Sequence, residues 1–336
     1  MSMRSWKAVF LPMIASLLLA GAVAPAAADS GGVTRFATLP QGGPSNPEGL
    51  AADAAGNIYV ASFDFDTPNV IYVFRASGQL RTTIPLTGHL PLGLAFNTAG
   101  DLFVADFGNG VVLRFAPPFT SSSTPAQTYT VCPGGGASTG CGLNAITFDT
   151  AGNLYVSDSF GGRIFKLNPA TAVPASIFIQ DEMLKPGSHG FPPFGANGLA
   201  FDAAGTKLYI ANTADDRILR YDVVTMTLST FAESINGADG IVFDEEGRLW
   251  VAANQADEVV ALNSRGRVVE RRGSFDGIGR DGAPKGLLFP ASLVISRGDM
   301  YVTNTALALT PAVGDEPEED VTTYTVSRFS LRRQDD

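Results

Sequence analysis

The sequence predicts an all-β protein folded as a six-bladed β-propeller, and three observations lead to this fold class. One phrase of about 15 residues occurs six times, the copies begin 42–53 residues apart, and helical periodicity is absent after the N-terminal leader. That period suits a blade of four strands. A closed ring also removes the exposed ends that an open stack of blades would have.

Residues 1–28 are interpreted as a Sec signal peptide. Arg4 and Lys7 precede an apolar run, and the small residues 25–28 provide a cleavage site before Asp29. A membrane anchor is the alternative, but Pro12 interrupts the apolar run. We therefore expect a secreted or periplasmic protein that has no membrane contact after cleavage.

Each copy of the phrase predicts two strands joined by a tight turn. A short apolar run leads into Asp-x-x-Gly or a variant, and an aliphatic and aromatic run follows. The Asp side chain can bond backbone amides of the turn, and Gly can take the positive φ of a hairpin. Two further strands would complete each blade. The copies occupy 47–61, 91–105, 143–157, 196–211, 238–252 and 290–303.

The ends of the chain predict how the ring closes. The alternating stretch 33–38 precedes the first copy and lacks a blade of its own, whereas 323–329 supplies only a third strand after the last copy. We expect the N-terminal strand to complete the last blade, so that residues 29–336 form one propeller domain.

Charge and cysteine content limit the partners and the compartment. The formal net charge is −10, and it becomes −12 when the leader is removed. Nucleic acid and anionic lipid are therefore poor partners. Cys132 and Cys141 lie nine residues apart in a Gly-rich stretch without nearby metal ligands. In an exported protein we expect them to form a disulfide.

One repeat position carries oxygen-bearing side chains in four of the six copies. Because the first strand of each propeller blade lines the axis, this position is expected to converge on one point. Two carboxylates meeting there would repel each other without a shared cation or proton. Ca²⁺ suits such an oxygen set, whereas Zn²⁺ would favour His or Cys. Asn and Asp before Gly also occur as ordinary turn residues. The six residues are Glu48, Leu92, Asn144, Asn197, Asp239 and Ala291.

The Glu-Gly of the first copy, the Asn-Gly-Leu of the fourth and above all the stretch 238–252 resemble the SMP-30/gluconolactonase family of six-bladed propellers. The resemblance implies a divalent cation, most commonly Ca²⁺, and hydrolysis of lactones. It implies that the cation ligands are Glu48, Asn144, Asn197 and Asp239, with Asp239 also acting as the base. The family's substrate-binding Arg is replaced by Gly142, which argues against a sugar lactone.

Two function classes follow from these similarities. The first is a metal-dependent hydrolase of lactones or related esters, in which a cation polarises the carbonyl and Asp239 activates water. The second is a non-catalytic binding propeller, because the ends of the second strands, as in 104–109 and 156–164, resemble NHL repeats. Both classes predict a small-molecule substrate or ligand.

Several other residues are candidates for the rim of the pocket. His89 and His189 precede the inner strands of the second and fourth blades, and Asp106 and Asp158 end second strands. A surface location for each His, and turn capping for each Asp, are the alternatives. The Pro/Gly-rich stretch 187–195 is a candidate pocket lid, and the acidic stretch 315–320 is expected to be a solvated loop.

Overall fold

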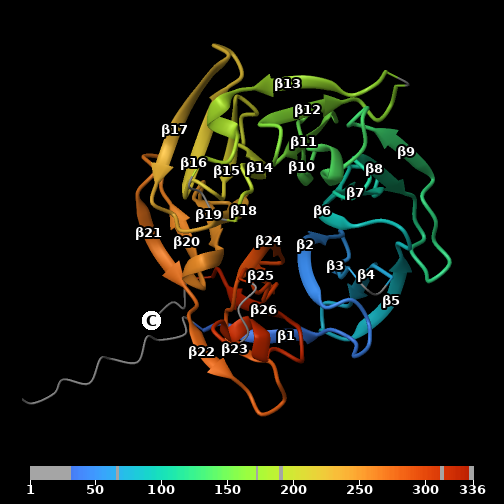
Figure 1. Cartoon of the computed structure of the whole chain (residues 1–336), viewed down its shortest axis with the longest axis vertical. Helices are drawn as coiled ribbons and strands as arrows, with labels where there is room; N and C mark the ends of the chain where they lie inside the picture. Colours follow the sequence, from blue (N-terminus) through green and yellow to red (C-terminus); the bar gives the residue numbers. More distant parts are fainter. Residues whose placement is uncertain (1–31, 66–67, 172, 189–191, 311–313, 333–336) are drawn as a thin grey trace, which may run out of the picture.

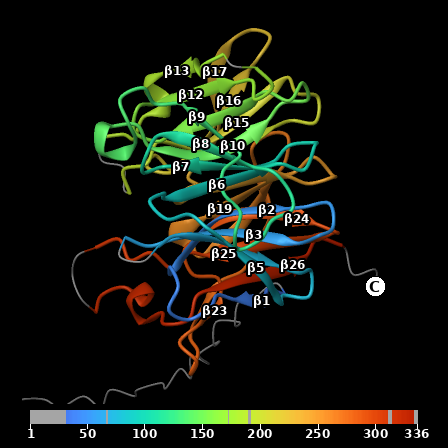
Figure 2. The same cartoon turned by 90° about the vertical axis from the view of Figure 1, so that its right-hand side faces the viewer.

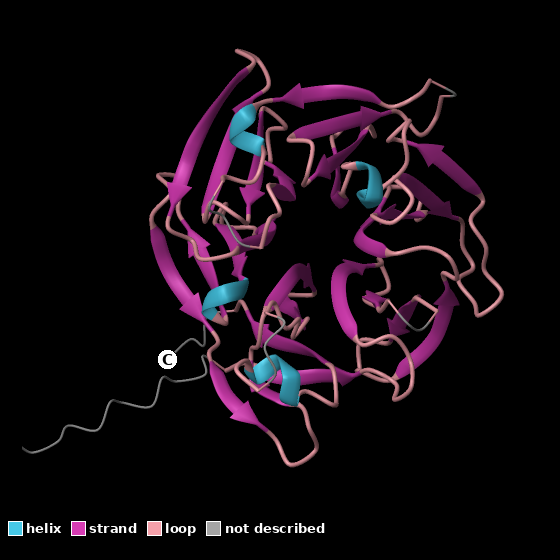
Figure 3. Cartoon of the chain, in the orientation of Figure 1, coloured by secondary structure: helices cyan, strands magenta, loops and turns pink. Residues whose placement is uncertain are grey.

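A computed structural model describes residues 32–65, 68–171, 173–188, 192–310 and 314–332. The predicted signal peptide therefore lies outside the described residues. Six sheets of four antiparallel strands surround a common axis (Figure 1), which confirms the predicted propeller. Strands dominate the described residues (Figure 3). No helix in these ranges is long and apolar enough to cross a bilayer.

The first three blades follow one another along the chain, each running from its inner strand to its outer strand. Blade one contains Asn46–Ala52 (β2), Ile58–Phe63 (β3), Val70–Phe74 (β4) and Leu80–Pro85 (β5). Blade two contains Pro91–Phe96 (β6), Leu102–Asp106 (β7), Val111–Phe115 (β8) and Gln127–Thr130 (β9). Blade three contains Leu143–Phe148 (β10), Leu154–Asp158 (β11), Arg163–Leu167 (β12) and Ser176–Gln180 (β13).

The remaining blades repeat this order, except at the closure. Blade four contains Ala196–Phe201 (β14), Lys207–Asn212 (β15), Arg217–Asp222 (β16) and Thr227–Glu233 (β17). Blade five contains Ala238–Phe243 (β18), Leu249–Ala253 (β19), Glu258–Leu262 (β20) and Val268–Arg272 (β21). Blade six contains Pro290–Ser296 (β24), Asp299–Asn304 (β25), Thr325–Ser330 (β26) and Thr34–Thr38 (β1).

The N-terminal strand closes the ring as predicted. Strand β1 pairs antiparallel with β26, with Thr34 opposite Arg328 and Thr38 opposite Thr325. The two ends of the propeller are thereby held in one sheet. A two-stranded sheet of Phe275–Ile278 (β22) and Pro284–Gly286 (β23), which lies between blades five and six, was not predicted from the sequence.

The turn between the first two strands forms through the side-chain contacts that the repeat predicts. In blade three, Oδ1 of Asp149 accepts hydrogen bonds from the amides of Ala151 at 3.0 Å and Asn153 at 2.9 Å. Gly152 adopts a φ of 80°. The Tyr155 hydroxyl donates to the other carboxylate oxygen at 3.0 Å. One carboxylate thus holds the turn and also satisfies the polar end of an aromatic residue buried between blades.

The described connections contain four short 3₁₀ turns, namely Ala137–Thr139 (η1), Glu182–Leu184 (η2), Asn254–Ala256 (η3) and Pro317–Asp320 (η4). Seen from the side, the loops that carry η1 and η4 project from the same face of the propeller (Figure 2). The first is closed by the predicted disulfide between Cys132 and Cys141, whose Cα atoms lie 6.3 Å apart. This face holds the candidate site.

Candidate functional site

The inner strand of every blade contains a β-bulge at the repeat position that the sequence singled out. In blade one, Pro47 pairs with Ser62 and Leu50 pairs with Val60, so Glu48 and the glycine after it lie outside the regular ladder. The same shift in register occurs in the other five inner pairs. Because a bulge changes the direction of a side chain, it turns these residues toward the axis.

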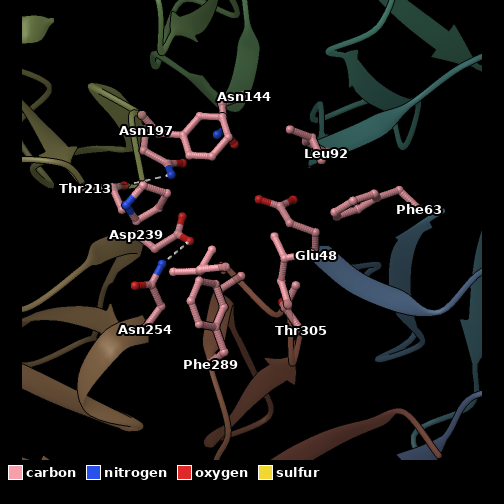
Figure 4. A pocket seen from close by; sticks show the side chains of 15 residues that line it. Glu48, Phe63, Leu92, Asn144, Asn197, Thr213, Asp239, Asn254, Phe289 and Thr305 are labelled. Carbon is pink, nitrogen blue, oxygen red and sulfur yellow. Dashed lines mark hydrogen bonds between the residues drawn. The ribbon is translucent and has the colours of Figure 1, made fainter. Parts of the chain in front are cut away.

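All six residues at this position line one central pocket that is open to solvent at its mouth. The four predicted ligands point into a common space (Figure 4). Each is buried, with exposed fractions of 8% for Glu48, 5% for Asn144, 4% for Asn197 and 7% for Asp239. The structure therefore brings together side chains that lie up to 191 positions apart in the chain.

The six residues at this repeat position are called the ring residues. Where a glycine follows a ring residue, it allows neighbouring inner strands to approach closely. A Cβ atom on Gly240 would lie 2.5 Å from the carbonyl oxygen of Ala291 in the next blade, far inside van der Waals contact. Gly198 faces the carbonyl oxygen of Asp239 in the same way. The Asp-Gly and Asn-Gly pairs of the repeat are thus explained by backbone packing around the axis, in addition to the turn chemistry considered from the sequence.

The ring residues are held in place by a second ring of polar residues, which was not predicted from the sequence. The Nδ2 atom of Asn144 donates to Oγ of Ser159 at 3.3 Å, and that of Asn197 donates to Oγ1 of Thr213 at 3.0 Å. Asn254 Nδ2 donates to Oδ2 of Asp239 at 3.1 Å. With their nitrogens held by the protein, Asn144 and Asn197 keep their amide oxygens for a ligand.

The hydroxyls of this second ring also link neighbouring blades. Ser159 donates to the carbonyl of Ala196 at 2.8 Å, and Thr213 donates to that of Ala238 at 2.7 Å. Both acceptors directly precede a ring residue. Ser159 and Thr213 could have been predicted from the sequence. Each lies directly after the second strand of its blade, at the same position of the repeat.

The two carboxylates of the pocket lie in an environment that opposes their ionisation. Burial, together with the charge of Asp239, raises the pKa of Glu48 well above its ordinary value. Burial raises the pKa of Asp239 from 3.8 to about 7, although hydrogen bonds from Asn254 and Asn197 oppose the shift. Oε2 of Glu48 and Oδ1 of Asn254 have no hydrogen-bond partner among the described residues. No Lys, Arg or His is among the described residues that line the pocket.

Of the residues predicted for the rim, the three that the structure describes lie elsewhere. Asp106 is fully buried and accepts hydrogen bonds from the amides of Leu90 and Asn109, while His89 Nδ1 lies 2.6 Å from its Oδ2. Neither His89 nor Asp106 is among the residues that line the pocket. Turn capping, the alternative considered from the sequence, describes the role of Asp106.

Asp158 has the same role in blade three. It accepts from the amides of Gly142 and Gly161 and pairs with Arg163 at 2.5 Å, so its carboxylate is not directed at the pocket. His189 lies outside the described residues. Within the stretch 187–195, Pro192 and Phe194 line the pocket, as a lid would.

Aromatic rings lie against Gly142, where the family resemblance would place an arginine. A Cβ atom at this position would lie 2.8 Å from Cε2 of Phe107 and 3.1 Å from Cδ2 of Phe160. Phe160 in turn stacks on Phe194, with ring centroids 5.6 Å apart and an interplanar angle of 16°. These rings leave no room for a side chain at position 142.

Comparisons with known proteins agree with this architecture. Residues 193–272 match the family model described as SMP-30/Gluconolactonase/LRE-like region, which confirms the resemblance over that segment. A luciferin-regenerating enzyme is similar at a TM-score of 0.62 and 18% identity, over 85% of this chain and 92% of that one. No curated protein matches the sequence.

Two further solved structures show the range of proteins with this fold. A gluconolactonase from Xanthomonas campestris has a TM-score of 0.61 and 14% identity, over 89% of both chains. A virginiamycin B lyase from Staphylococcus aureus has a TM-score of 0.52 and 11% identity, over 88% of this chain and 99% of that one. At such identities the likeness shows the fold, and the chemistry has to be argued from the site.

Proposed function

We propose that this protein is a metal-dependent hydrolase of lactones or related esters. One observation carries the proposal: two buried carboxylates, Glu48 and Asp239, share a pocket with amide oxygens, and no basic side chain lines that pocket among the described residues. An uncompensated pair of buried carboxylates is costly. A bound cation would remove the cost.

The residues present fit a hard divalent cation. Glu48, Asn144, Asn197 and Asp239 provide two carboxylates and two amides, and Oε2 of Glu48 lacks any other described partner. Ca²⁺ accepts such oxygen ligands together with water. In the part of the chain that the structure describes, no three or more His, Cys, Asp or Glu side chains are grouped so that they could hold a metal ion, which disfavours zinc. When bound, the cation would supply Lewis-acid polarisation of the substrate carbonyl.

The chain's own residues supply the proton transfer. Asp239 accepts a proton from water, and Asn254 holds its Oδ2 in place. The water oxygen bonds to the carbonyl carbon, the carbon–oxygen bond of the ring breaks, and the proton passes from Asp239 to the leaving alkoxide. The product is the hydroxy acid, and neither an oxidant nor a reductant is needed.

The test compares the wild type with Asp239→Asn in an assay of lactone and aryl ester hydrolysis, with added Ca²⁺ or with EDTA. We expect EDTA to abolish turnover and Asp239→Asn to lower kcat by at least about 10²-fold, since it removes the base. Asp106→Asn is the matched control, because that carboxylate is buried away from the pocket. Circular dichroism checks that each variant is folded.

The family match at 193–272 supports a hydrolase over the alternative binding propeller. A binding propeller would retain its cation and its ligand without turnover. Absence of hydrolysis across lactones and esters of varied structure would reject the hydrolase.

A further inference from the structure

The walls of the central pocket are apolar above its polar floor. Phe63, Leu92 and Phe289 are each less than a tenth exposed and line it, and Phe194 and Leu307 complete the wall from loops. In Figure 4, Phe63 and Leu92 lie on the side of Glu48 away from Asp239, and Phe289 lies below. A bound molecule would therefore meet oxygen ligands at one end and hydrocarbon around the rest of its surface.

The hydroxyl groups that line the pocket are already engaged by the protein. Thr213 donates its hydroxyl hydrogen to the carbonyl of Ala238 at 2.7 Å, and Thr305 donates to the carbonyl of Pro47. Because a hydroxyl carries one hydrogen, neither can also donate to a ligand. These two hydroxyls can only accept hydrogen bonds, so a hydroxyl-rich molecule would find few partners on these walls for the hydrogen bonds to water that it loses.

The backbone holds part of the wall in an unfavourable conformation. Phe289 has a φ of 45°, in the left-handed region that bulky residues rarely occupy. Its amide donates to Oδ1 of Asp257 at 2.8 Å, and its carbonyl accepts from the amide of Thr305 at 3.1 Å. These two bonds hold the backbone of Phe289 in this strained conformation, and its ring lines the pocket.

Within the acidic stretch 315–320, predicted to be a solvated loop, Glu316 has a structural role. Oε2 of Glu316 accepts hydrogen bonds from the amides of Leu309 at 2.5 Å and Thr310 at 3.3 Å. Leu309 and Leu307, on the same loop, both line the pocket. Glu316 thus fixes the backbone of the segment that supplies these two leucines.

The apolar surface continues outward from Phe194. Its ring stacks on Phe160 and lies 6.1 Å, centroid to centroid, from Phe107. Phe107 and Phe160 are only partly buried, so the three rings form an apolar path between the pocket and the surface.

From these features we propose that the substrate is a lactone or ester with an alkyl or aryl substituent, and that a polyhydroxylated sugar lactone is excluded. This inference rests on the proposed hydrolase function and names its substrate class. The carbonyl group would sit at the floor beside Asp239, and the substituent would lie against Phe63, Leu92, Phe194 and Phe289. The bond changes are those given above for hydrolysis.

The first test measures hydrolysis of γ-lactones with alkyl chains of increasing length, from γ-butyrolactone to γ-decalactone, beside glucono-δ-lactone. With Ca²⁺ present, kcat/KM should rise about fourfold per added methylene (~0.8 kcal/mol) until the pocket is full. Glucono-δ-lactone should react at least about 100-fold more slowly than γ-decalactone. Equal kcat/KM values for these two substrates, or no dependence on chain length, would overturn the inference.

Variants of the wall test which residues carry the preference. Leu92→Asn keeps a similar side-chain shape but places an amide in the wall, and Phe194→Leu removes a ring. Each should reduce the preference for γ-decalactone over γ-butyrolactone by about tenfold or more. Phe178→Leu is the control, because Phe178 packs between Tyr155 and Tyr221 and does not line the pocket. An unchanged preference in both wall variants would contradict the assignment.

A binding measurement separates this inference from the hydrolase proposal. The matching γ-alkyl lactams keep the ring and carbonyl but resist hydrolysis, and titration calorimetry reports their affinity. If no lactone is hydrolysed but affinity rises with chain length, the hydrolase proposal fails and the apolar pocket stands. If lactones are hydrolysed and neither rate nor affinity depends on chain length, the hydrolase stands and this inference fails.

Discussion

Removal of the proposed cation should make the stability of the protein depend on pH in a direction set by Asp239. Burial raises the pKa of this carboxyl from 3.8 to about 7 in the folded state. As pH rises, the unfolded chain therefore loses its proton first. The contribution of Asp239 to the free energy of unfolding is highest below about pH 4, falls as pH rises to about 7 and stays low above that.

The size of the effect follows from the two pKa values. The difference between 3.8 and about 7 corresponds to about 4 kcal/mol. The cation-free protein loses this much of its free energy of unfolding between low pH and pH 8, because Asp239 ionises. Glu48, whose pKa is also raised, adds to the effect in the same direction. Calcium at 100 times its Kd should restore about 2.7 kcal/mol at this pH.

Urea unfolding followed by tryptophan fluorescence, at pH 4 and pH 8 and with EDTA or Ca²⁺, measures these free energies. In EDTA, Asp239→Asn should be more stable than the wild type at pH 8 by up to about 4 kcal/mol and nearly equal to it at pH 4. Asn keeps the shape and the acceptor for Asn254 but cannot ionise. A variant that removes the proposed base should thus stabilise the metal-free protein.

Asp244→Asn is the matched control with the opposite sign. Burial raises the pKa of Asp244, but hydrogen bonds from Trp250 and Arg248 outweigh burial and lower it overall. Its loss should therefore destabilise the protein at pH 8. If Asp239→Asn is no more stable than the wild type at pH 8 in EDTA, the reasoning about the buried carboxylate pair is refuted.

Three further predictions concern the parts of the structure that support the site. In a urea titration, Gly198→Ala should lower the free energy of unfolding by more than about 2 kcal/mol, because its Cβ would overlap a carbonyl oxygen of the next blade. Gly134→Ala is the control and should be near neutral, because no atom lies within 4 Å of its Cβ position. Thr213→Val leaves the amide of Asn197 without its acceptor, so calcium affinity measured by calorimetry should fall about tenfold, and unchanged affinity would argue against the second ring. Asp149→Ala should cost about 1–3 kcal/mol through loss of the bonds that hold its turn, without changing kcat/KM, and a loss of activity would contradict a purely structural role.

The sequence by itself determined the number of blades, their order, the closure of the ring and the register of the central residues. These features were readable because each blade is a local unit of strands and turns, and the unit recurs at a nearly constant period. Residues at one register of a closed ring must meet at the axis. For that reason Glu48, Asn144, Asn197 and Asp239 could be grouped from the sequence, although no two of them belong to the same blade.

Only the tertiary structure decided how the ring residues are aimed and what surrounds them. The bulges depend on the pairing of two strands, and the hydrogen bonds of Ser159 and Thr213 cross between blades. Phe194 and Leu307 reach the pocket from loops that lie outside the repeat, so no periodicity marks them. Asp106 has the same sequence context whether it caps a turn or faces a pocket, and only its contacts distinguish the two roles.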